Sequence, residues 1–65
     1  MRASDLARIE AIKLRAKADA TYSIARAIEN QGTGPTGVAD LASELIEKSA
    51  VQMDLLAQTL EAEGR

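Results

Sequence analysis

The chain has 65 residues, which is enough for one domain at most, spanning residues 1–65. A lone domain of this size buries only about 60% of the surface that its unfolded chain exposes. There is no cysteine and no histidine, which excludes disulfides, thiol nucleophiles, histidine general bases and zinc sites of the usual ligands. The net charge of −2 argues against a general electrostatic grip on nucleic acid. We therefore expect neither an enzyme nor a cofactor-binding or metal-binding protein, and a core that needs support from self-association.

The first part of the chain predicts one long helix over about residues 5–30, because it contains no Gly or Pro. Ser4 is the expected N-cap. Small and apolar residues recur at alternating steps of four and three, which is typical of a heptad seam. The members of this seam are Ala7, Ala11, Leu14, Ala18, Thr21, Ala25 and Ile28. A second apolar line on another face consists of Leu6, Ile9, Ala16, Ala20, Ile24 and Ala27. Two apolar lines indicate two neighbouring helices.

Residues 31–37 predict a turn, because they hold three of the four glycines and the only proline. The glycines supply positive φ angles, Pro35 favours the start of a second helix, and Thr36 or Gly34 can cap it. The segment also matches G-x-G-x-x-G, the pattern of a nucleotide-binding loop. That loop follows a β-strand, whereas a helix is expected here, so we interpret the segment as a hinge.

A second helix is expected over about residues 38–63, with Gly64 just past its end. Its broad apolar face indicates the main core contribution. The face consists of Val38, Leu41, Ala42, Leu45, Ile46, Ala50, Met53, Leu56, Ala57 and Leu60. Leu45 and Leu56 lie at the centre of this arc. Ser49 falls within it, where its hydroxyl can donate to the carbonyl four residues earlier.

The two predicted helices differ in charge. Residues 1–31 carry a net charge of +2 and residues 38–65 a net charge of −4, which favours antiparallel packing of one against the other. The predicted fold is an all-α antiparallel helical hairpin. Because two helices alone leave the far side of each apolar arc wet, we expect a homodimer that forms a four-helix bundle.

One stripe of the first helix stands out as a candidate partner-binding surface. It contains Arg8, Ile12, Arg15, Asp19, Tyr22 and Arg26. Tyr22 is the only aromatic residue of the chain, and Tyr and Arg dominate binding hot spots. The alternative is that Tyr22 is a boundary residue and the arginines are solubilising. Val51 and Leu55 form a second, smaller candidate patch. The carboxylates of Asp40, Glu44 and Glu47 are interpreted as a solvated acidic face.

These features favour a small non-enzymatic protein-binding module, a homodimer that docks a helix face onto an unidentified protein. In size and shape it resembles the compact inhibitors, antiactivators and accessory regulators of phages and plasmids. The alternative is RNA binding, since a dimer of short hairpins resembles the repressor-of-primer family in architecture, although none of that family's RNA-contacting positions is matched here. A structural assembly piece is a third alternative. With no apolar leader and no stretch of membrane-spanning length, we expect a cytoplasmic location without membrane contact.

Overall fold

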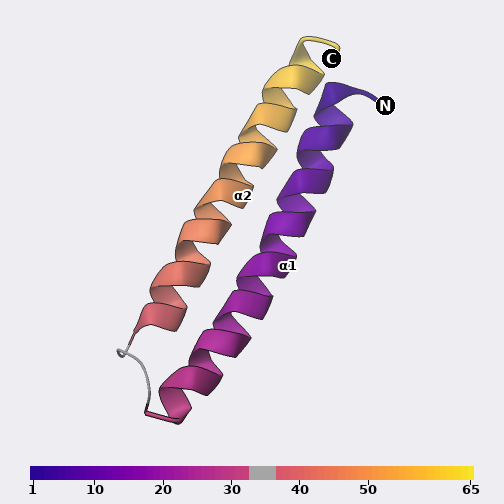
Figure 1. Ribbon diagram of the computed structural model, residues 1–65. Coiled ribbons are helices and arrows are strands. Elements are labelled where there is room, and N and C mark those ends of the chain that lie inside the picture. Colours follow the sequence, from indigo (N-terminus) through magenta and orange to yellow (C-terminus); the bar gives the residue numbers. More distant parts are fainter. Residues whose placement is uncertain (33–36) are drawn as a thin grey trace.

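In the computed structural model the chain forms two long antiparallel helices that lie side by side (Figure 1). The structure describes residues 1–32 and 37–65. Helix α1 spans Ala3–Asn30 and helix α2 spans Val38–Ala62. The predicted all-α hairpin is confirmed, with helix boundaries within two residues of those expected. The expected roles of Gly34, Pro35 and Thr36 fall outside the described residues.

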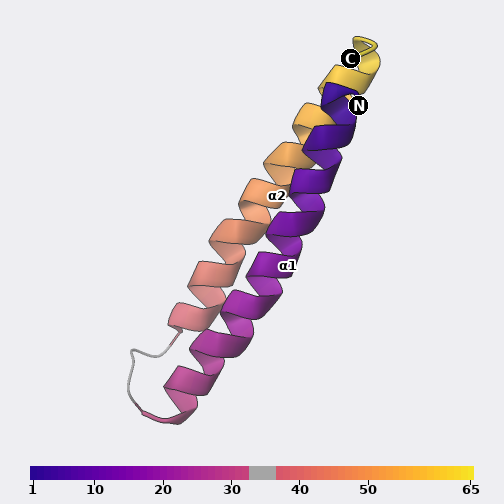
Figure 2. The ribbon, with the colours of Figure 1, turned by 45° about the vertical axis from the view of Figure 1, so that its right-hand side comes forward.

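The contact between α1 and α2 is built from alanines. Among the described residues, no side chain larger than alanine is fully buried. The buried residues are Ser4, Ala7, Ala11 and Ala18 on α1 and Ala39, Ala50 and Ala57 on α2. Helices approach closely where the facing side chains are small, and the two remain adjacent along their length in both views (Figures 1 and 2). The small-residue seam expected on α1 is therefore the face that meets α2.

The broad apolar face of α2 divides into two parts. Ala50 and Ala57 are buried against α1, whereas Leu45 is 57% exposed and Leu56 is 44% exposed. This division arises because α2 turns its own small residues toward those of α1, which leaves the leucines on its flank. The hairpin by itself thus gives Leu45 and Leu56 no core to fill, and the bundle core expected for them requires a second neighbour.

The N-terminal end of α1 differs from the expectation. Arg2 occupies the N-cap position, so the expectation that Ser4 caps the helix is wrong. Ser4 instead lies inside the helix and is only 4% exposed, because its small side chain fits the seam. Its backbone N–H donates to the carbonyl oxygen of Arg65 at 3.1 Å. A free N–H of α1 is therefore satisfied by the segment that follows α2, and residues 4 and 65 are brought together.

Glycines occupy the positive φ positions at the helix ends, as expected. Gly32 has φ +72° after α1, Gly37 has φ +88° before α2 and Gly64 has φ +76° after α2. Beyond α2, Gly64 N–H donates to the Glu61 carbonyl at 3.1 Å and Arg65 N–H to the Leu60 carbonyl at 2.8 Å. This is the Schellman pattern, which satisfies the last carbonyls of a helix.

Candidate functional site

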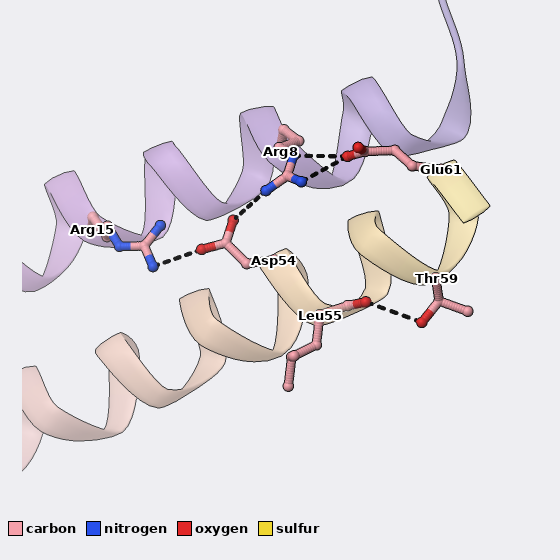
Figure 3. Close-up of polar contacts among 6 residues, drawn as sticks. All are labelled: Arg8, Arg15, Asp54, Leu55, Thr59 and Glu61. Atoms are coloured by element: carbon pink, nitrogen blue, oxygen red, sulfur yellow. Dashed lines mark hydrogen bonds and ion pairs between the residues drawn. The ribbon is translucent and has the colours of Figure 1, made fainter. Parts of the chain in front are cut away.

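One long side of the hairpin carries ion pairs between the helices (Figure 3). The Arg8 guanidinium contacts the Glu61 carboxylate at 2.7 Å and that of Asp54 at 3.6 Å, and the Arg15 guanidinium contacts Asp54 at 2.7 Å. Asp54 therefore lies between two arginines. Arg15 also approaches a Glu47 oxygen at 4.0 Å. We call Arg8, Arg15, Asp54 and Glu61 the ion-paired side.

The register of the hairpin follows from the spacing of these charges. Arg8 and Arg15 are seven residues apart, as are Asp54 and Glu61, and seven residues are close to two helical turns. Arg8 and Arg15 come directly after the seam residues Ala7 and Leu14. Asp54 and Glu61 come directly after the half-buried Met53 and Leu60, which continue the seam on α2. The side chains are 27–49% exposed, and such pairs typically contribute about 0–1 kcal/mol each. They therefore set the direction and register of pairing more than its strength.

Tyr22 and Arg26 form a separate polar group nearer the turn. The Arg26 guanidinium lies 5.2 Å from the Tyr22 ring centroid and donates to the Tyr22 hydroxyl at 2.7 Å. This hydrogen bond raises the pKa of the Arg26 guanidinium. Glu29 accepts from Arg26 at 3.4 Å, and its other oxygen accepts the Ala39 backbone N–H at 3.2 Å. Glu29 thus ties this group to the first turn of α2.

The three apolar residues of the predicted sites lie on two helices, with Ile12 on α1 and with Val51 and Leu55 one turn apart on α2. Ile12 is 68% exposed, Val51 is 47% exposed and Leu55 is 48% exposed. Because Arg15 is level with Asp54, Ile12 lies level with residue 57 and Val51 with residue 18. The structure thus divides the predicted site residues into the ion-paired Arg8 and Arg15, the stacked Tyr22 and Arg26, the separate Ile12 on α1, and the neighbouring Val51 and Leu55 on α2.

A shallow hollow beside Tyr22 extends the candidate surface from α1 onto α2. Its volume is 400 Å³. It is lined by Ala18, Asp19, Tyr22, Ser23, Ser43 and Glu47. Ser23, Ser43 and Glu47 were not among the predicted site residues. The sequence signal for this hollow is the small size of the two serines, one on each helix. The hollow lies next to Tyr22, on the same side of the hairpin.

The opposite long side of the hairpin was not among the predicted partner-binding residues, although Leu6 and Ile24 belong to the second apolar line expected on the first helix. Its large apolar side chains are 44–64% exposed. They are Leu6 and Ile24 on α1 and Val38, Leu45 and Leu56 on α2, and we call them the leucine face. Leu6, Ile24, Val38 and Leu56 each come directly before an alanine of the seam, and Leu45 comes directly before the half-buried Ile46. The paired charges, in contrast, come directly after seam residues. With 100° between successive residues, these two positions fall on opposite sides of the seam.

The chemical inventory of the described residues is limited. Within residues 1–32 and 37–65, no group of His, Cys, Asp or Glu side chains is arranged to hold a metal ion. Neither α1 nor α2, as far as the structure describes the chain, combines the length and apolar character of a membrane-spanning helix.

Comparison of this chain with models of known protein families, with characterised protein sequences and with solved structures finds no match. Functional inference therefore rests on the two sides of the hairpin.

Proposed function

We propose that the chain is a non-enzymatic protein-binding module that works as a homodimeric four-helix bundle. In this proposal the bundle docks a helix face onto a target protein and acts as an inhibitor, antiactivator or accessory regulator. The observation that carries the proposal is the inverted distribution of apolar residues. The hairpin buries alanines, while leucines and isoleucines remain on its outside.

Such a distribution favours an associated state of the protein over a monomer. A chain of 65 residues has little stability to spare, and an alanine seam buries little apolar area for each residue that it orders. Extended exposed apolar surface typically marks an interaction site. Self-association covers one such surface, and the remaining helix faces are available to a different protein.

The target-binding surface proposed here is the part of α1 around Ile12 and Tyr22. Arg8 and Arg15 already have carboxylate partners on α2, so their role is to hold the shape of this side. Ile12 and Tyr22 supply apolar and aromatic contact area, and Tyr22 borders a hollow that can accept a side chain of the target. The same ion pairs reduce the charge that the arginines can offer to phosphates, which makes protein the favoured class of target.

The test is affinity capture with the full tagged chain from lysate of the organism that encodes it, with and without nuclease. We expect the same protein in both samples, and its loss with the double variant Ile12→Ala/Tyr22→Ala. The helicity and the oligomeric state of that variant should stay unchanged, since both side chains lie outside the seam. The matched control is Val51→Ala/Leu55→Ala, on the other candidate patch.

Full binding by Ile12→Ala/Tyr22→Ala would show that this surface is wrong, and loss with the control pair would move the site to α2. Recovery of RNA alone, only in the absence of nuclease, would overturn the protein-binding function and make Arg8, Arg15 and Arg26 the residues to substitute.

A further inference from the structure

We infer that the leucine face seats a second copy of this chain, with α2 antiparallel to α2 of that copy, so that Leu45 of each chain packs on Leu56 of the other. This inference rests on the proposed function and specifies which face forms the dimer. It also predicts which face stays free for a target.

The α2 stripe that contains both leucines has the chemistry of an interface. Its positions are spaced by three and four residues, as one helical face requires. The stripe consists of Ala42, Leu45, Ser49, Gln52, Leu56 and Thr59. None of the six is charged, although 28% of the chain is charged. A helix face intended for solvent is ordinarily charged or strongly polar, so this stripe has the composition of an interface.

The positions of Leu45 and Leu56 on α2 also suit a two-fold symmetric pairing. An interface between two identical chains related by a two-fold axis must be complementary to itself. Helix α2 spans Val38–Ala62, and its middle is residue 50. Leu45 and Leu56 are equally distant from a point between residues 50 and 51. A two-fold axis at that point places Leu45 opposite Leu56 of the second copy, twice.

The same axis also matches the remaining members of the stripe. Ser49 meets Gln52 of the second copy, and Ala42 meets Thr59 of the second copy. The hydroxyl of Ser49 already donates to the Leu45 carbonyl at 3.2 Å, and that of Thr59 to the Leu55 carbonyl at 3.1 Å. Neither hydroxyl proton is therefore left without an acceptor when the face is covered. Apolar residues meet apolar or small ones, and polar residues meet near the axis.

The broad side of the hairpin that carries the leucine face is also large enough for a dimer interface. The Cα atoms extend over 50 × 16 × 8 Å, so one broad side of the hairpin covers about 800 Å², the area that each partner contributes to a stable interface of standard size. On α1 the same side offers Leu6 and Ile24 together with small alanines. Its charged residues, Glu10, Lys13 and Lys17, have long side chains that can extend to the rim. This side is therefore large enough for a second copy, with the uncharged stripe of α2 at its centre.

The arrangement leaves the ion-paired side on the outside of the bundle. Ile12 and Tyr22 then occur twice on the dimer, once on each chain, and remain accessible to a target protein. The dimer face and the proposed target surface are thus separate, so they can be tested separately.

The test uses engineered cysteines, because the natural chain has none. Leu45→Cys and Leu56→Cys are made as single variants of the full chain, confirmed as helical by circular dichroism, and oxidised alone or as a mixture. We expect disulfide-linked dimers from the mixture and few from either variant alone. In the inferred register a residue 45 lies 11 positions from residue 45 of the second copy, or about 16 Å along the helix, which is too far for a disulfide.

The matched control is a mixture of Val51→Cys and Leu55→Cys, which lie off the leucine face and should stay unlinked. Preferential linkage in a mixture of Ile24→Cys and Leu45→Cys would indicate that α1 packs on α2 of the second copy, and would overturn the antiparallel α2 pairing. A monomeric mass by sedimentation equilibrium at micromolar concentration would overturn the dimer altogether. Neither result involves a target, so a capture that is lost with Ile12→Ala/Tyr22→Ala would still support target binding.

Discussion

The two long sides of the hairpin differ although they are built from the same heptads. On the ion-paired side, Arg15 follows Leu14 and its charge is met by Asp54 of the same chain at 2.7 Å. On the leucine face, Leu56 precedes Ala57 and is 44% exposed. The charges of the first side have partners within the chain, whereas the leucines of the second side remain exposed on the hairpin. A shift of one or two positions along the helix thus decides whether a residue helps to fold the hairpin or is left for association.

The two sides also differ in whether they contribute mainly to the specificity of helix pairing or to stability. Half-exposed ion pairs fix which helices pair and in which direction, at a small gain in free energy. Covering leucines contributes more, since burial of a leucine side chain is worth about 1.5–3 kcal/mol. We therefore expect substitutions on the two sides to differ in size, in salt dependence and in dependence on protein concentration.

The largest effect is expected for Leu56→Ala. If a second copy covers the leucine face, this substitution should lower the free energy of unfolding by about 2–5 kcal/mol per chain. The loss should appear in urea denaturation followed at two protein concentrations, since a dimer is stabilised by mass action.

The control is Leu55→Ala on the same helix. Leu55 is 48% exposed, close to Leu56, but it lies off the leucine face, so we expect a loss below about 1 kcal/mol. Equal losses for both variants would mean that the leucine face is uncovered in solution, and the distinction between the two sides would fail.

An intermediate effect is expected for Ala50→Leu in the seam. Ala50 is 0% exposed, and a larger side chain would push the helices apart, at about 1–3 kcal/mol. Both sides of the hairpin would be disturbed, because both depend on the close approach of α1 and α2. Thermal denaturation by circular dichroism measures the loss, and Ala16→Leu, at an exposed position, serves as control. A variant as stable as the natural chain would contradict the close alanine contact.

The smallest effect is expected for Arg15→Gln on the ion-paired side. Combined with Asp54→Asn in a double-mutant cycle, it should give a coupling of about 0.2–1 kcal/mol. Because the pair is partly exposed, the coupling should shrink in high salt. Urea denaturation at low and high ionic strength measures it. A coupling that persists unchanged in concentrated salt would indicate a pair far more buried than the structure shows.

The sequence was sufficient to predict the hairpin and much of its seam. Two long segments free of Gly and Pro, separated by a glycine-rich turn, predict two helices with little ambiguity. The position of Ala18 in a regular heptad identifies the face that becomes buried. The role of Ser4 was predicted wrongly. A capping role follows from the local sequence alone, whereas the backbone of Ser4 is in fact hydrogen-bonded to Arg65, which is distant in the sequence.

The candidate site was harder to predict than the fold. Arg8 and Arg15 were read as part of a binding stripe because the sequence does not show which acids of α2 come opposite them. Leu45 was expected in the main apolar arc, but a helical wheel does not fix the rotation of the helix about its axis. Here that rotation moves the leucine from the interhelical contact to its flank. The residue types indicated which stripes of each helix are apolar or charged. The rotation and register of the two helices then decide which of these stripes lie against the other helix.

The hydrogen bond between Ser4 N–H and the Arg65 carbonyl has a consequence for re-engineering the chain. Residues 4 and 65 are close enough for a short Gly/Ser linker to join the two termini, and such joined ends are the usual requirement for circular permutation. New ends opened between α1 and α2 would then convert the hairpin into two helices connected at the opposite end. The permuted chain would keep the alanine seam, the ion pairs and the leucine face, and would place fusion tags at the opposite end of the hairpin.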